Sequence, residues 1–250
     1  MTNTHSLNGI FNVDINTMRD LFDSAVACCL ENADQDHAGL DLPPEALNKS
    51  MQQYFAVIST INDQSEPNLA INQDEIEDLA DYGLGLLEKF TECAQKLNCD
   101  ESFSIFEQLS IPLAIWAAQH NFTINNIEVV VNAISNTANH TQDKAHLSEL
   151  IDTIEVIIES IGANIKADQD KANMGRPWRI LNLNQGIIAT RSQDPKRMEA
   201  VFEQLIYRLP DDAAGFFAEG MEQMDSIDYP KHVRDVMQKY FHQTNKPTLH

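Results

Sequence analysis

The 250-residue chain lacks most of the features that mark membrane, secreted and zinc-binding proteins. Its longest uninterrupted apolar run, Ile111 to Ala118, is far shorter than the roughly twenty residues that cross a bilayer. Its N-terminal residues hold no basic region followed by an apolar stretch, so no secretion signal is expected. Its four cysteines include no Cys-x-x-Cys pair. We therefore expect a cytoplasmic protein without membrane contact, in which the cysteines are buried and reduced.

Sequence motifs for catalysis are also missing. There is no Gly-rich phosphate loop, no Gly-x-Ser-x-Gly and no His-Glu-x-x-His. Cys28 and Cys29 are adjacent on an apolar stripe with no base nearby in sequence, which favours packing over a nucleophilic role. No cofactor is predicted and a non-enzymatic protein is favoured. A convergent catalytic triad leaves no linear motif, so that alternative stays open.

Basic residues are scarce and unevenly placed. The chain has 17 Lys and Arg against 38 Asp and Glu, a net charge of −21. Residues 1–143 alone hold 22 acids against 4 bases. A surface of this kind repels phosphate backbones and acidic lipid headgroups. Neither nucleic acid nor a membrane is therefore an expected partner.

One stretch reverses this balance, and we call residues 171–208 the basic segment. It has seven bases against three acids, a local charge of +4, and it contains a Trp, a line of amides and a Gly within a helical pattern. Arginines beside an aromatic ring suit a protein partner or an acidic peptide. The predicted binding residues are Arg176, Trp178, Arg179, Asn182, Gln185 and Arg191. The alternative is that Trp178 is core and the arginines bridge to the acidic N-terminal part of the chain.

A metal site is a weaker hypothesis. Asp143, His146 and Glu149 follow each other at intervals of three residues, so a helix would bring neighbouring members together, and His140 lies just before them. Helical di-metal proteins draw Glu-x-x-His pairs from two helices, and no such pair occurs here. A solvated helix N-terminus is the favoured interpretation, and no bound metal is predicted.

Amphipathic helices dominate the pattern. Apolar residues at helical spacing predict helices over residues 16–31, 44–61, 72 onward, 100 onward and 146–161, and Asn125 with Glu128 predicts a capping box before residues 127–134. Two prolines open similar sequences, PEALNKSMQQYF from Pro44 and PKHVRDVMQKYF from Pro230, with a looser copy from Pro195. Equivalent positions of the first two copies should be buried alike. Internal duplication and chance convergence both remain open.

These observations predict an all-α protein of about nine or ten helices, built as stacked helical hairpins, with a closed helical bundle as the alternative. Pro177 and Pro210 are 33 residues apart and Pro195 and Pro230 are 35 apart, so alternate prolines recur with a period near 34. Trp178 with Leu181 resembles the opening Trp-x-x-Leu of tetratricopeptide-type repeats, which have this period. The resemblance covers about 65 residues and implies helical hairpins. Asn182, Gln185 and Asp194 depart from that family's pattern.

The expected organisation is an acidic helical region over 1–161, a polar linker over 162–175, two helical hairpins over 176–242 and a tail over 243–250, or one continuous domain. The expected function is protein binding or scaffolding near the basic segment. A metal-binding helical bundle or enzyme and a structural homo-oligomer are the alternatives.

Overall fold

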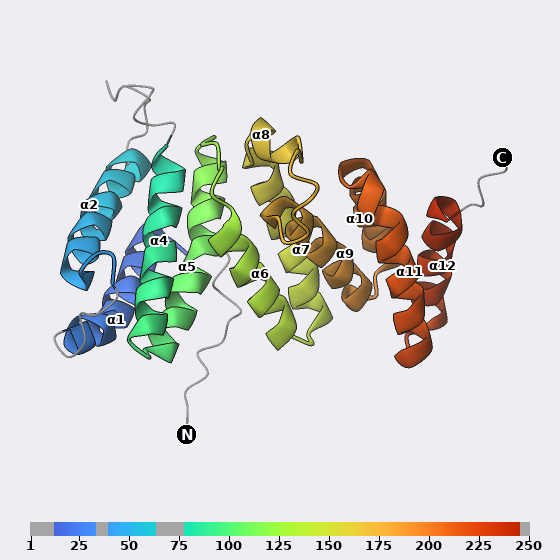
Figure 1. Cartoon of the computed structure of the whole chain (residues 1–250), viewed down its shortest axis with the longest axis horizontal. Helices are drawn as coiled ribbons and strands as arrows, with labels where there is room; N and C mark the ends of the chain where they lie inside the picture. Colours follow the sequence, from blue (N-terminus) through green and yellow to red (C-terminus); the bar gives the residue numbers. More distant parts are fainter. Residues whose placement is uncertain (1–12, 34–39, 64–77, 246–250) are drawn as a thin grey trace. The chain divides into compact units, whose positions relative to one another are not determined.

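A computed structural model describes residues 13–33, 40–63 and 78–245 (Figure 1). Within these ranges 81% of residues are helical and no strand is present, which confirms the predicted all-α class. The helices are α1 (Ile15–Ala33), α2 (Pro44–Asp63), α4 (Leu79–Lys96), α5 (Asp100–Gln119), α6 (Glu128–His140), α7 (Lys144–Ser160), α8 (Ala163–Lys166), α9 (Pro177–Ser192), α10 (Pro195–Arg208), α11 (Pro210–Ser226) and α12 (Lys231–Thr244). None of them is long and apolar enough to cross a membrane.

Prolines set many of the helix starts. Pro44, Pro177, Pro195 and Pro210 are each the first residue of a helix, and Pro230 directly precedes α12. At the first helical position the missing N–H costs no hydrogen bond, and the fixed φ angle of proline already suits a helix. The prolines therefore divide the C-terminal part of the chain into successive short helices, as the sequence predicts.

The chain forms two compact units. The first comprises residues 1–137 and 156–162, and the second comprises residues 138–155 and 163–250, so the division falls within α6 and α7. In the predicted organisation residues 138–155 belong to the N-terminal region, whereas here they belong to the second unit. The predicted linker contributes the short helix α8 and a series of turns to that unit.

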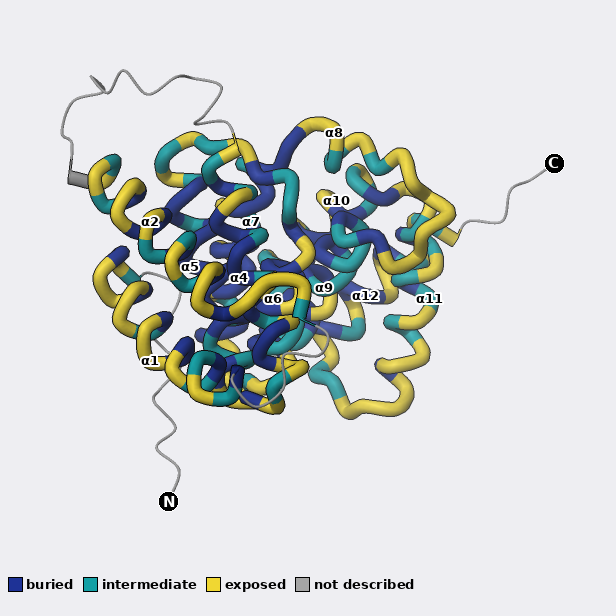
Figure 2. Tube along the Cα trace, turned by 60° about the vertical axis from the view of Figure 1, so that its left-hand side comes forward, coloured by how far each residue is buried: buried dark blue, intermediate teal, exposed yellow. Residues whose placement is uncertain are grey.

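The first unit contains a cycle of four helices. α1 contacts α2, α2 contacts α4, α4 contacts α5, and α5 returns to α1. Each helix contributes one phenylalanine to its centre, and Phe22 of α1 lies within 5.7 Å of the ring centroids of Phe55, Phe90 and Phe106. All four rings are buried, and buried residues follow the inner faces of these helices (Figure 2). Aromatic packing of this kind adds specific ring contacts to the burial of a large apolar area.

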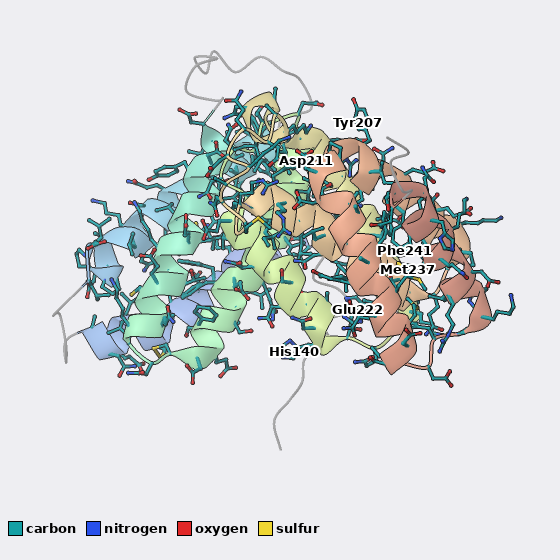
Figure 3. All side chains as sticks on the ribbon, turned by 45° about the vertical axis from the view of Figure 1, so that its right-hand side comes forward. His140, Tyr207, Asp211, Glu222, Met237 and Phe241 are labelled. Atoms are coloured by element: carbon teal, nitrogen blue, oxygen red, sulfur yellow. A yellow bond between two sulfur atoms is a disulfide. The ribbon has the colours of Figure 1, made fainter. Side chains whose placement is uncertain are left out.

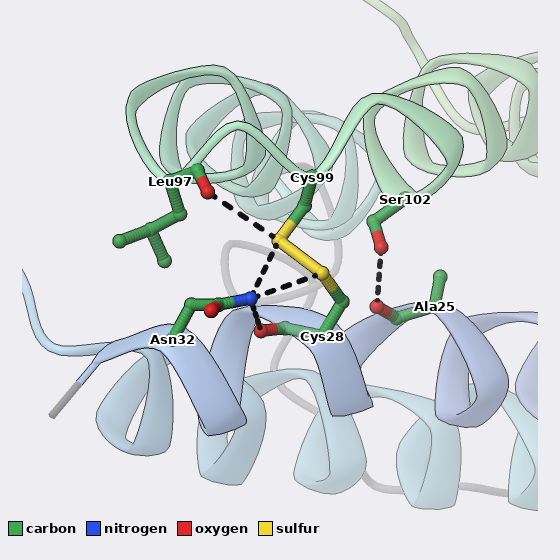
Figure 4. Close-up of a disulfide and its surroundings, with 6 residues drawn as sticks. All are labelled: Ala25, Cys28, Asn32, Leu97, Cys99 and Ser102. Carbon is green, nitrogen blue, oxygen red and sulfur yellow. Dashed lines mark hydrogen bonds between the residues drawn. A yellow bond between two sulfur atoms is a disulfide. The ribbon is translucent and has the colours of Figure 1, made fainter. Parts of the chain in front are cut away.

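A disulfide joins Cys28, near the end of α1, to Cys99, just before α5 (Figure 4). The side-chain amide of Asn32 donates to the Cys28 carbonyl at 3.0 Å, and the Ser102 hydroxyl donates to the Ala25 carbonyl at 2.8 Å across the same pair of helices. The expectation of four reduced cysteines is therefore wrong for this pair. The two residues are 71 apart in sequence, and only the packing of α1 on α5 brings their side chains together.

The second unit contains a series of short helices. α9 packs on α10, α10 packs on both α11 and α12, and α11 packs on α12. Successive helices are joined by few residues, which is typical of helical hairpins. Its aromatic core consists of Phe202, Phe217 and Tyr240, whose ring centroids lie 5.0 to 5.7 Å apart.

The two similar proline-led sequences bury their equivalent Met and Tyr residues alike. Met51 and Tyr54 of α2 are buried, and so are Met237 and Tyr240 of α12. The third pair differs, because Phe55 is buried whereas Phe241 is only half-buried. The expectation of equal burial is therefore wrong at Phe241. The ring of Phe55 contacts Phe22, and no such core ring contact is made by Phe241 within the described ranges.

The expected capping box at α6 is absent. The helix begins at Glu128, and Asn125 and Asn126 instead donate their backbone N–H groups to the carboxylate of Asp81 on α4, at 2.7 and 2.8 Å. The side chain of Asn126 donates to Glu88, about two turns further along α4. The polar residues before α6 therefore attach it to α4. The expected start of α4 near residue 72 lies outside the described residues.

Glycines within α4 supply a first testable prediction. A Cβ atom at Gly83 would lie 2.3 Å from a ring carbon of Tyr54, whereas a Cβ atom at Gly85 would meet only the Asn126 side chain at 3.8 Å. Gly83→Ala should lower the free energy of unfolding by about 1 to 3 kcal/mol through overpacking. Gly85→Ala, the matched control, should raise it by about 0.5 to 1 kcal/mol through helix propensity. Urea denaturation of both variants checks this, and equal effects would contradict the close approach of Tyr54.

Candidate functional site

The first two arginines of the predicted binding site belong to an internal ion cluster. Arg176 is 6% exposed and binds the carboxylates of Asp168 and Asp212. Arg179 donates to Asp212 at 2.6 Å and to the Met174 carbonyl at 3.0 Å. Burial raises the pKa of Asp212, but the hydrogen bonds and charges of Arg179 and Arg176 outweigh it, so that this pKa lies below its ordinary value. The ionised carboxylate therefore adds stability above its unfolded pKa, and this contribution is lost as the pH falls through the folded pKa.

The middle residues of the predicted binding site lie in the core of the second unit. Trp178 is 4% exposed, and Asn182 and Gln185 are each 1% exposed. The Asn182 amide donates to the Trp178 carbonyl at 2.8 Å, and the Gln185 amide donates to the carboxylate of Glu155 on α7. The same carboxylate accepts from Arg208 at 3.1 Å. These side chains satisfy one another inside the second unit.

The last arginine of the set caps a helix. The guanidinium of Arg191 donates to the carbonyls of Ala138 and Thr141 at 2.7 and 2.5 Å, at the C-terminal end of α6. Terminal carbonyls of a helix carry partial negative charge, and a cation placed there is stabilised. The positive charge of Arg191 is thus largely compensated within the unit.

The basic segment pairs with acids close to it in the chain. The carboxylates that it binds are Asp152, Glu155, Asp168, Asp194, Asp211 and Asp212, all in the second unit. Among the residues that the structure describes, contacts of these arginines with residues 1–143 are limited to the two carbonyl contacts of Arg191. An acidic partner at this segment stays a prediction, but the exposure that it requires at Arg176 and Trp178 is absent.

Charge reversal at Arg179 is therefore expected to act on stability. Arg179→Glu would place a carboxylate against Asp212 and should lower the free energy of unfolding by about 2 kcal/mol, most strongly at low salt. Lys196→Glu is the matched control, because Lys196 is exposed on the same segment and makes no ion pair within the described ranges. Thermal denaturation of both variants at 20 and 300 mM NaCl checks this loss of stability. An unchanged midpoint for Arg179→Glu would contradict the structural role.

The weak metal candidates do not form a site. His146 is buried at 6% exposure, whereas His140, Asp143 and Glu149 are exposed. Asp143 accepts from the backbone N–H of Ala145 at 2.9 Å, as a residue that caps the start of α7. Among the residues that the structure describes, no group of three or more His, Cys, Asp or Glu side chains is arranged to hold a metal ion.

Cys28 and Cys29 are not placed to act as nucleophiles. Cys28 is consumed in the disulfide, and Cys29 is fully buried. A hydrogen bond with Cys93 and burial both raise the pKa of the Cys29 thiol well above its ordinary value, so this sulfur stays protonated. The reactive form of cysteine is the thiolate. Packing, as the sequence favours, is the role of Cys29.

An open groove is lined by residues of α9, α11, the segment between α11 and α12, and α12, and we call it the α9–α11 groove. Its volume is about 500 Å³, and its lining includes Ile187, Phe216, Glu219, Glu222, Ile227 and Tyr229. Figure 3 shows Glu222 on α11 and Met237 on α12. A second cavity of about 610 Å³ shares Ile187, Arg191, Ile227 and Tyr229 with the first and extends to Lys144 at the start of α7. The two cavities therefore adjoin each other on the second unit.

Close approach of two helices shapes this groove. A Cβ atom at position 186 would lie 2.6 Å from a ring carbon of Phe216, so only glycine lets that ring approach α9. Beside it Ile187 is 48% exposed, and Ile227, from the segment after α11, is also 48% exposed. Two large aliphatic side chains of the groove lining are therefore open to solvent. Such a combination is typical of a docking surface.

The sequence patterns did not predict this groove, although one of them indicates an exposed apolar residue. Ile187 and Ile188 are neighbours on one helix, so a single buried face cannot hold both, and the structure buries Ile188. The glycine noted in the helical pattern is Gly186. Which of the many exposed positions share a groove depends on α11 and α12, which lie more than 20 residues further along the chain.

Comparisons of this chain with family models, curated proteins and solved structures found no match.

Proposed function

We propose that this chain is a non-enzymatic protein-binding protein, and that its α9–α11 groove receives a helical segment of a protein partner. The observation that carries the proposal is the pair of half-exposed isoleucines, Ile187 and Ile227, that line a groove of about 500 Å³. Amphipathic helices bind by inserting apolar side chains at helical spacing into grooves of this kind.

The shape of the groove supports a segment of protein as its occupant. The first cavity adjoins the second, of about 610 Å³, and the two share Ile187 and Ile227. Two adjoining cavities suit several successive side chains of one helix better than a single compact molecule. The lining of the first cavity combines apolar side chains with charged groups, and protein interfaces contain both.

The test uses a fluorescein-labelled 18-residue peptide with leucines on one helical face and glutamines elsewhere. Ile187→Gln and Ile227→Gln should each weaken its binding about tenfold, because each removes roughly half the burial of one aliphatic side chain. The control is Tyr207→Gln, since Tyr207 is 83% exposed on α10 and lies outside the groove (Figure 3). Fluorescence anisotropy measures the dissociation constants.

Three outcomes would overturn the proposal. The first is no binding of the leucine peptide compared with a scrambled peptide of the same composition. The second is equal weakening by Tyr207→Gln and Ile187→Gln. The third is a dimer, seen by light scattering, that Ile187→Gln dissociates, because a second copy of the chain would then fill the groove. Unchanged thermal midpoints of the three variants show that they fold.

A further inference from the structure

The acidic side of the α9–α11 groove determines what kind of helix fits it. Glu219 and Glu222 line the groove from α11, and both are exposed. Neither carboxylate makes an ion pair within the described ranges, although the unit's other helices are rich in such pairs. Two negative charges therefore remain uncompensated at the edge of an apolar surface.

The one cation in the first cavity does not neutralise them. Arg191 lines the same cavity, but both terminal nitrogens of its guanidinium are bound to the carbonyls at the end of α6. A guanidinium held by those carbonyls is fixed at the end of α6, and its charge is offset by the negative end of the helix dipole. The electrostatic potential on the α11 side is thus set by Glu219 and Glu222.

From these charges we infer that the segment bound in the groove is a basic amphipathic helix, with two Lys or Arg residues one turn apart that face Glu219 and Glu222. This inference rests on the proposed function. The two glutamates are three residues apart on α11, which places them about one helical turn apart along one side of the groove. Bases at positions i and i+3 or i+4 of a helix in the groove match this interval.

The far end of the groove is different in charge. Lys144 and Asp228 both line the second cavity and are both exposed, so this end carries charges of both signs. A basic residue of the ligand is therefore favoured most beside α11, where Glu219 and Glu222 are both negative. The bases of the ligand should accordingly lie on the side of the helix that faces α11. The net charge of −21 on the whole chain adds long-range attraction for such a ligand and raises its association rate.

The experiment compares three peptides with the same leucine face, carrying Lys, Gln or Glu at two positions one turn apart. At 50 mM NaCl the Lys peptide should bind the full chain about fivefold more tightly than the Gln peptide, and the Glu peptide should bind most weakly. At 300 mM NaCl the Lys advantage should largely disappear.

The decisive variant is Glu219→Gln/Glu222→Gln, which should remove the preference for Lys over Gln. Asp170→Asn/Asp225→Asn is its control, because it changes the net charge equally, and both of its residues are exposed and lie outside the groove lining. Equal loss of preference in the two double variants would show attraction by overall charge only and would overturn the inference. Equal affinity of the Lys and Gln peptides, with both weakened by Ile187→Gln, would overturn it while the proposed function stands. Binding of any peptide that Ile187→Gln leaves unchanged would instead overturn the proposed function.

Discussion

Changing both disulfide cysteines, in the variant Cys28→Ala/Cys99→Ala, is expected to lower the free energy of unfolding of the first unit by about 4 kcal/mol. The bridge closes a loop of 71 residues, and in the chain-entropy description a cross-link of this length removes that much conformational freedom from the unfolded chain. The loop includes α2 and α4, so that half of the four-helix cycle is held between its ends.

Fluorescence can follow each unit separately. The chain has two tryptophans, Trp116 on α5 of the first unit and Trp178 on α9 of the second. In a Trp178→Phe background, the emission of Trp116 in increasing urea reports the unfolding of the first unit. Reductant should lower the midpoint of the parent protein and leave that of Cys28→Ala/Cys99→Ala unchanged. Denaturation with an alkylating agent and no reductant should modify two cysteines, Cys29 and Cys93, and modification of all four would contradict the bridge.

Truncation of the phenylalanine in the two proline-led sequences should have unequal effects. Phe55→Ala is expected to lower the free energy of unfolding by about 3 to 5 kcal/mol, because it removes a buried ring that packs on Phe22 and leaves a cavity. Phe241→Ala should cost only about 1 kcal/mol, since that ring is half-buried and less apolar area is lost.

The two substitutions control each other, because they make the same chemical change at the same position of similar sequences. Urea denaturation monitored at Trp116 measures the effect of Phe55→Ala, and emission of Trp178 in a Trp116→Phe background measures that of Phe241→Ala. A loss at Phe241 equal to the loss at Phe55 would show that Phe241 is as deeply packed as its counterpart. That result would restore the equal burial that the sequence alone predicts.

The cysteines show why residue spacing was a poor guide to their state. The absence of Cys-x-x-Cys excludes a local motif, but a disulfide needs only that two Cα atoms approach to about 6 Å, and those of Cys28 and Cys99 are 6.2 Å apart. That proximity is created by the packing of α1 on α5. The neighbouring Cys29 on the same helix turn instead meets Cys93 of α4 in the core. The two adjacent cysteines therefore have different partners, because their side chains point to different sides of one helix.

The ion pairs of the basic segment also could not be predicted from residue spacing. Seven bases within 38 residues are visible in the sequence, but the acids that neutralise them are distributed over residues 152 to 212 and are brought to them by hairpin packing. The position of Trp178 beside Arg176 and Arg179 in the sequence therefore indicated a binding surface. In the structure Trp178 is a core residue that lies beside an ion cluster. The amides at positions 182 and 185 are internal for the same reason.

The helices themselves were determined locally. Amphipathic spacing predicts the apolar face of α7, and the prolines at 44, 177, 195 and 210 each fix a helix start, because both effects depend only on residues within a turn or two. The all-α class and the inward orientation of Met51, Tyr54, Met237 and Tyr240 follow from the same local patterns. The tertiary structure alone decided the disulfide, the partners of the arginines and the α9–α11 groove. Each of these joins residues far apart in sequence, and the pattern of one helix carries no information about which other helix packs against it.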